Sequence, residues 1–287
     1  MTVPALLVLA LVLAAPEGGQ DRDPALERYA DLVGHYAGGD RGAAVASLGA
    51  WRPRDVEAAV DLLLAWRDGR GSGPSGASAS TFADFPLPSA ALLHAETAHA
   101  APLPAAADLH LALAARLAEA LSESPVHRPF ARRFCLAMAL RAYRETEWAL
   151  ALHLARKGLK LFPRDPELLL AIASVDESAG FLGLLPPASQ PSQFERGSLT
   201  ARDLWDRTDQ QRHLVEAEKA LGAAIEADPA MLEARLRMGR VLWRRGRPDA
   251  ARSHLEAVLR ASPPPLLGYL AHLFLGSEPE EARRRPG

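Results

Sequence analysis

The chain has 287 residues, a formal net charge of −2 and a hydrophobic content of 48%. The near-neutral charge gives no electrostatic reason for nucleic acid to be a general partner, because phosphate backbones attract strongly basic surfaces. Aromatic residues make up only 6% and alanine is abundant, which favours helices over a β-sandwich. The composition therefore predicts an all-α fold.

The first fifteen residues, MTVPALLVLALVLAA, form an apolar run that precedes a polar stretch. Its core, Ala5 to Leu13, is shorter than the roughly 20 residues of a membrane-spanning helix but suits a secretory signal peptide. No Lys or Arg precedes this core, so a weak signal or a misassigned start codon is the alternative. We expect residues 1–15 to be a signal peptide cleaved after Ala14 or Ala15, and the mature chain to be exported, periplasmic or secreted. No later segment has the length and hydropathy of an integral membrane segment.

Residues 22–67 are predicted to be helical. Apolar residues recur at helical spacing on both sides of a Gly-rich break at 38–40, which predicts a helical hairpin, and Pro53 to Trp66 adds a third helix. The next segment, 68–88, begins with DGRGSGPSGASAS, a composition that cannot bury enough apolar area to become ordered. We therefore expect a flexible linker or loop at 68–88, with a domain boundary near 68–81.

The region 89–128 is predicted to be a helical connector that contains the best candidate for a metal site. It is expected to hold two helices, about 89–100 and 105–121. Two His ligands on a helix lie one turn apart in H-E-x-x-H, whereas His94 and His99 are 99 − 94 = 5 residues apart, which rotates them by about 140°. Glu96 and His99 share a face, but no further ligand motif accompanies them. We expect no metal and no cofactor.

A repeat occupies residues 129–275. Pro229 and Pro263 each close a helix-like run, and their spacing, 263 − 229 = 34, is the period of a helix-turn-helix array. Within the unit that ends at Pro263, residues 246–249 combine a helix-ending Gly with a Pro suited to open the next helix. Gly239 lies in mid-helix, where glycine costs about 1 kcal/mol relative to alanine, so we expect a close helix approach there.

This unit resembles the tetratricopeptide repeat family, whose pattern places a Gly and a large apolar residue in the first helix and an Ala early in the second. Those roles fall here to Gly239, Leu242, Ala251 and the closing Pro263, while Arg235 replaces the family's first-helix Trp. A shift of 34 residues superimposes Ala217, Leu221, Ala224 and Pro229 on Ala251, Leu255, Val258 and Pro263. The resemblance covers about residues 130–263 and implies an α-solenoid of antiparallel helical hairpins in a right-handed superhelix.

Two further helical runs precede these units. Residues 134–163 are predicted to form a hairpin with a turn at 144–147, and residues 166–180 resemble the first helix of the next unit. That unit ends 229 − 163 = 66 residues after the previous closing Pro, which is 32 more than one period. We expect the excess as an insertion at about 181–205, whose Pro, Ser and Gly residues forbid a continuous helix. Such insertions often map to a binding face, although a passive surface loop is the simpler interpretation.

The array is expected to end at a capping helix. Residues 266–275 are apolar and are predicted to cover the last repeat, whereas the charged tail at 276–287 is expected to be disordered. Because exposed repeat ends stack readily unless they are capped, self-association remains an open alternative.

The last repeat is locally basic and supplies the candidate binding residues. Residues 235–260 contain eight Arg but only two acidic residues, Asp249 and Glu256. In tetratricopeptide arrays the first helices line the concave groove, so the resemblance implies that the first-helix face of this repeat points into it. Tyr143 and Arg144 stand at the same offsets from Pro163 as Trp243 and Arg244 do from Pro263.

We hypothesise that this groove binds an extended or helical acidic peptide, with Arg holding carboxylates and aromatic rings supplying apolar contact. The groove residues on this hypothesis are Tyr143, Arg144, Leu236, Arg240, Trp243 and Arg244. The last four fall at helical spacings of three to four residues and are expected to share one face. The simpler alternative is a solvated Arg face with Trp243 packed on a neighbouring repeat.

No catalytic residue is predicted. Cys135, the single cysteine, excludes an intramolecular disulfide and is expected to be a small buried hydrophobe. The sequence lacks nucleophile-elbow, phosphate-binding and dinucleotide motifs, and its preference for Arg over Lys is typical of a GC-rich bacterial genome. We expect a non-catalytic protein–protein interaction scaffold or adaptor of the bacterial cell envelope. The alternative is a metal-dependent or small-molecule-processing envelope enzyme of unknown reaction.

Overall fold

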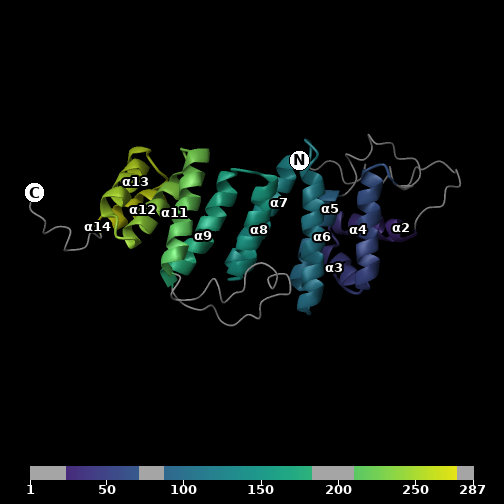
Figure 1. The fold of residues 1–287 in the computed structure, drawn as a ribbon. Coiled ribbons are helices and arrows are strands. Elements are labelled where there is room, and N and C mark those ends of the chain that lie inside the picture. The colour runs from purple at the N-terminus through teal and green to yellow at the C-terminus, as the bar shows by residue number, and fades with distance from the viewer. Residues whose placement is uncertain (1–23, 71–86, 183–209, 277–287) are drawn as a thin grey trace, which may run out of the picture. The chain divides into compact units, whose positions relative to one another are not determined.

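A computed structural model describes residues 24–70, 87–182 and 210–276 of the chain. These residues form helices throughout, and no strand occurs among them (Figure 1). The chain divides into two compact units between Phe134 and Cys135, inside one helix. The predicted all-α fold is confirmed, while the predicted signal peptide at 1–15 lies outside the described residues.

The N-terminal unit is built from α2 (Pro24–Ala37), α3 (Arg41–Gly49), α4 (Pro53–Arg67), α5 (Leu87–Ala100) and α6 (Pro104–Ser122). The turn between α2 and α3 uses Gly39, whose φ of 104° lies in the left-handed region that glycine adopts without a steric penalty. The Asp40 side chain then accepts a hydrogen bond from the Ala43 amide at 3.4 Å and caps α3. The predicted hairpin with its break at 38–40 therefore agrees with the structure.

The domain boundary predicted near 68–81 is wrong. Helices from both sides of that segment pack in the same unit, because α5 contacts α2 and α3, and α6 contacts α4. Residues 89–128 are therefore part of a core rather than a connector. A Gly/Ser-rich composition indicates only whether the segment itself becomes ordered. The extent of a compact unit depends instead on which helices bury their apolar faces against one another. Most of the expected linker, residues 71–86, lies outside the described residues.

The C-terminal unit begins within α7 (Arg128–Arg144) and continues through α8 (Trp148–Leu161), α9 (Pro166–Leu182), α11 (Gln210–Ala227), α12 (Leu232–Arg244), α13 (Pro248–Arg260) and α14 (Pro265–Gly276). From α8 onward, each described helix packs against the next described one, as Figure 1 shows in teal to yellow. This nearest-neighbour packing is the architecture of a helical repeat array. The expected tail beyond Gly276 lies outside the described residues.

Two hairpins of this unit have the same turn. Thr146, between α7 and α8, has a φ of 63°, and Gly246, between α12 and α13, has a φ of 73°. In both turns this residue's amide donates to a carbonyl three residues earlier, Tyr143 at 3.1 Å and Trp243 at 3.0 Å. The turn predicted at 144–147 is thus observed, and it repeats at 244–247.

The predicted role of Gly239 is also confirmed. A Cβ atom added at Gly239 in α12 would lie 2.7 Å from both Cγ and Cδ2 of Leu255 in α13. Real Cβ contacts are essentially never that short, so the two helices can lie this close only because position 239 carries no side chain.

The hairpin of α9 and α11 is longer than the other hairpins. Shifts of 66 and 34 residues align α12 and α13 with 166–178 and 214–226. Beyond these ranges α9 continues through 179–182, and α11 begins four residues earlier, at Gln210, and ends one residue later, at Ala227. The added turn of α9 packs closely on α11, since a Cβ at Gly180 would lie 2.6 Å from Cγ of Leu214. The insertion predicted at about 181–205 therefore starts after Leu182, and residues 183–209 lie outside the described part of the chain.

Candidate protein-binding surface

Two consecutive acidic residues of α9, Asp176 and Glu177, are buried at 2% and 3% exposure. Asp176 Oδ1 lies 2.9 Å from Nδ1 of His213 in α11. Glu177 Oε2 accepts a hydrogen bond from Nη1 of Arg237 in α12 at 2.8 Å. Because successive residues of a helix point about 100° apart, this acidic pair bonds to two different helices, α11 and α12.

Arg237 is the centre of an ion-pair network. It also donates to the Glu233 carboxylate, one turn earlier in α12, at 2.9 and 3.0 Å. Burial opposes its charge, but Coulombic attraction to Glu177 and Glu233 and the hydrogen bonds that Arg237 donates to them raise the pKa of Arg237 overall. The guanidinium therefore stays charged, and the buried Glu177 carboxylate is compensated.

Arg240, the next residue on this face, is held by three side chains. Its guanidinium carbon lies 5.3 Å from the ring centroid of Phe181 and 5.3 Å from that of Phe274. Its Nε lies 3.4 Å from Oε1 of Glu177, and its side chain is 33% exposed. These contacts connect α9, α12 and α14 and fix the direction of the guanidinium.

The sequence-predicted groove residues do not share one environment. Leu236 is 3% exposed and packs with Leu255, Val258 and Ala271. It therefore offers no surface to a peptide, and its assignment to the groove is corrected. Trp243 is partly buried against a different cluster that includes residues of α9 and α11, so the face predicted on α12 is divided between two packing interfaces.

Three other predicted residues remain accessible. The Tyr143 hydroxyl lies 2.8 Å from Ser178 Oγ and connects α7 to α9. Arg144 and Arg244 are exposed at the last position of α7 and of α12. Arg144 donates through Nε to the Leu140 carbonyl at 3.2 Å. No acidic side chain of the described residues pairs with either Arg.

Sequence reasoning missed the residues that neutralise the basic repeat. Glu177 pairs with two of its Arg side chains, and Glu218 of α11 pairs with Arg245 and, at 2.7 Å, with Arg247. Neither Glu lies within residues 235–260, so counting charges in that window overestimates the positive field. The repeat pattern could have indicated these partners, because it places α9 and α11 beside α12.

The His94 region is a buried polar network. His94 is 0% exposed; its Nε2 lies 2.7 Å from the Tyr29 hydroxyl and its Nδ1 lies 2.9 Å from Nδ1 of His110. Burial lowers the pKa of His94 to about 3, with His110 adding to the effect, and burial lowers the pKa of His110 to about 4. His99, by contrast, is exposed. The two His of the sequence motif therefore do not converge, and the described residues contain no group of three potential ligands.

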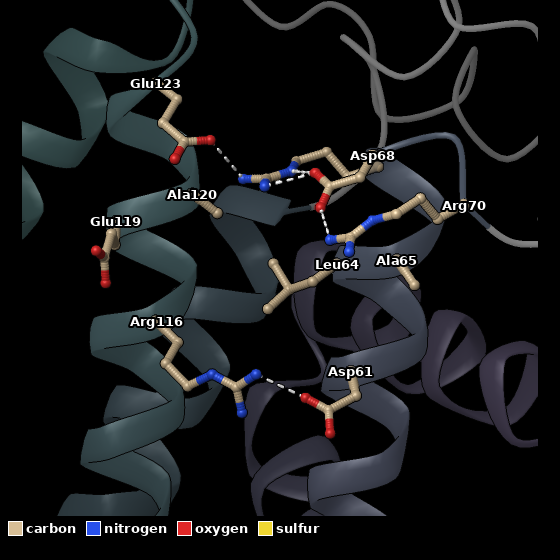
Figure 2. Close-up of a pocket in the computed structure, with 10 residues that line it drawn as sticks. Asp61, Leu64, Ala65, Asp68, Arg70, Arg116, Glu119, Ala120 and Glu123 are labelled. Carbon is tan, nitrogen blue, oxygen red and sulfur yellow. Dashed lines mark hydrogen bonds and ion pairs between the residues drawn. The ribbon is translucent and has the colours of Figure 1, made fainter.

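A surface hollow between α4 and α6 carries charged side chains that pair with one another (Figure 2). Arg116 donates to Asp61 at 2.6 Å, and Arg67 lies 3.3 Å from Glu123. Arg70 pairs with Asp68, which Arg67 also contacts. The exposed pair of Arg116 and Asp61 contributes about 0–1 kcal/mol. The ion pairs in this hollow therefore link α4 to α6, and its Arg side chains are already paired with acidic side chains.

A protein-family model described as tetratricopeptide repeat matches residues 210–271. The match covers α11, α12, α13 and most of α14. No curated protein matches the sequence significantly. Over residues 24–70, 87–182 and 210–276, no helix combines the length and hydropathy needed to cross a membrane.

Proposed function

Because residues 210–271 make this chain a tetratricopeptide-repeat protein, and such repeats are protein–protein interaction modules, we propose that its array binds an acidic segment of a partner protein. Arg144 and Arg244 are the proposed contacts for the partner's carboxylates. Repeats of this family typically serve as non-catalytic scaffolds.

The observation that carries this proposal is the unequal use of Arg on the first helices. Arg237 and Arg240 are already compensated by Glu177, so their charge is largely committed within the chain. Arg144 and Arg244 are exposed and lack an acidic partner among the described residues. An unpaired guanidinium can bind a carboxylate through two parallel hydrogen bonds, which are stronger than neutral ones.

Tyr143 and the aromatic pair around Arg240 supply the remaining recognition surface. Tyr143 is fixed by Ser178 and stands next to Arg144, while Phe181 and Phe274 are partly buried on either side of Arg240. Rings that are held in place lose little entropy on binding, and aromatic residues are enriched among residues that dominate binding energy. The proposed segment therefore combines acidic with apolar side chains.

The test is affinity capture from the native cell envelope followed by mass spectrometry. The Arg144→Glu/Arg244→Glu variant is compared with a control, Arg156→Glu/Arg260→Glu, which changes exposed Arg on the second helices α8 and α13. We expect the control to retain the partner and the first variant to lose it, because each charge-assisted contact contributes about 1.5–3 kcal/mol. Equal retention by both variants would refute the role of Arg144 and Arg244.

We also propose that the chain is exported and works in the bacterial cell envelope. The apolar core and the small residues of positions 1–15 support export. Intact-mass analysis of the protein from its native cells tests this proposal. A mature chain that begins at Ala15 or Pro16 supports export, whereas a chain that retains residues 1–15 opposes it.

A further inference from the structure

The solvent-facing side of α14 is mainly apolar, with His272 as its one polar side chain. Leu266, Tyr269 and Leu273 are 68%, 64% and 50% exposed. The other exposed positions of the helix are Pro265, His272 and Gly276, and α14 contains no Asp, Glu, Lys or Arg. The solvent side of the preceding helix α13 instead carries Ser253, Glu256 and Arg260. A contiguous exposed apolar surface marks an interaction site.

The opposite side of α14 is already in use. Ala271 is buried against Leu236, Leu255 and Val258, and Leu267, Leu270, Phe274 and Leu275 pack around that cluster. The helix is therefore apolar on both sides, and a helix that is apolar all round belongs in a buried position. The docked side explains why α14 caps the array, and the side chains of Leu266, Tyr269 and Leu273 remain exposed on its other side.

The exposed row does not fit another repeat hairpin. In the 34-residue register, Leu273 stands where α12 has Gly239, and the close packing of α13 on α12 depends on that glycine. A leucine side chain at this place holds an incoming helix farther away. Spacings of three and four residues between large apolar side chains instead suit interdigitation in the manner of a coiled coil.

We propose that the occupant of this surface is α14 of a second copy of the chain, packed antiparallel about a two-fold axis near Tyr269. Leu266 and Leu273 flank Tyr269 by three and four residues, so antiparallel pairing places each Leu266 opposite the partner subunit's Leu273. Such a self-complementary arrangement is what an isologous contact requires. The pairing brings no like charges together, since α14 carries none, and the two helix dipoles oppose each other.

The size of the surface makes this dimer weak. A helix of 12 residues is about 18 Å long, and its single face covers less than the roughly 800 Å² per partner of a standard interface. We therefore expect reversible association with a Kd on the order of 100 µM. This inference does not depend on the proposed peptide-binding role of Arg144 and Arg244, which lie on other helices.

Sedimentation velocity on the full 30.8 kDa chain, over about 5–500 µM, is the first test. The weight-average mass is expected to rise with concentration, and Tyr269→Arg/Leu273→Arg is expected to weaken association at least tenfold. The matched control is Leu103→Arg/Val126→Arg, which changes side chains that are 65% and 73% exposed in the N-terminal unit. A constant monomer mass, or equal weakening by both variants, overturns the proposal.

A second test locates the contact. With Tyr269→Cys near the proposed two-fold axis, mild oxidation by copper phenanthroline is expected to produce a disulfide-linked dimer. Leu103→Cys, at a comparable exposure of 65%, is the control and is expected to stay monomeric. If both variants form the linked dimer equally, or if neither forms it, two copies of the chain do not meet at α14. The second outcome is also the one expected if a different protein occupies this surface.

Discussion

Arg237 donates a hydrogen bond to Glu177 at 2.8 Å across 60 positions of the sequence. The bond joins the first helices of two successive repeats, α9 and α12, and the acceptor carboxylate is 3% exposed. A buried carboxylate between two Arg side chains connects neighbouring repeats and sets which Arg remain available to a partner.

Replacing Glu177 with Gln is expected to destabilise the C-terminal unit by about 2 kcal/mol, because it removes the buried carboxylate that pairs with Arg237 and Arg240 and leaves Arg237 only its exposed partner Glu233. Urea-induced unfolding monitored by circular dichroism measures the change. Glu233→Gln, which removes the other partner of Arg237 where the side chain is 48% exposed, is expected to cost no more than about 1 kcal/mol. Equal losses for the two variants would contradict the importance of burial.

Alanine at Gly239 is expected to destabilise the C-terminal unit by about 1–3 kcal/mol, although alanine is normally the better helix former. The added methyl group would meet Leu255 at 2.7 Å. The control is Gly222→Ala in α11, where the nearest atom, Cε of Met238, is 3.8 Å away. That variant is expected to gain about 0.5–1 kcal/mol, so a gain at both positions would show that α12 and α13 separate at little cost.

The N-terminal unit is expected to lose stability in acid. The pKa values of His94 and His110 are lowered to about 3 and about 4, whereas an unfolded His titrates near 6.5. Below about pH 6.5 the unfolded chain therefore binds protons that the folded unit does not. Stability is present above that pH and falls towards pH 4, by up to about 2.7 kcal/mol per pH unit for the pair.

Urea midpoints of the N-terminal unit, measured at half-unit pH intervals, test this dependence. The His94→Gln/His110→Gln variant is expected to show a shallower slope even if its stability at pH 7 is lower. His153 and His254 of the C-terminal unit also have lowered pKa values, chiefly because of burial. They titrate in the same direction, so the two units must be followed separately. An unchanged slope in the double variant would refute the assignment.

The Cys135 thiol is expected to react slowly. Burial raises its pKa to about 11, so the thiolate, which is the reactive form, is scarce at pH 8. Reaction with a disulfide reagent such as Ellman's reagent is expected to be on the order of 100-fold slower in the folded chain than in urea. Equal rates in the two states would show that the thiol is accessible and unperturbed. Its partial burial agrees only in part with the prediction of a small buried hydrophobe.

The helices and turns were predictable because their causes are local. Pro53, Pro104 and Pro248 open helices, and Gly39 and Gly246 occupy the left-handed turn positions. A turn or a cap is determined within four or five residues. The repeat period also allowed a prediction about packing between helices, because equally spaced Pro and Gly residues imply that successive repeats pack alike. The close helix contact at Gly239 was predicted correctly.

Tertiary structure alone decided the candidate site and the division into units. Leu236 has the spacing of a groove residue, but α14 folds over it. The charges of the last repeat look uncompensated in sequence, but Glu177 and Glu218 reach them from α9 and α11. These outcomes depend on how amphipathic helices stack, and many stackings bury similar apolar area, so the side chains that meet across 27 to 60 residues are not specified by any local pattern.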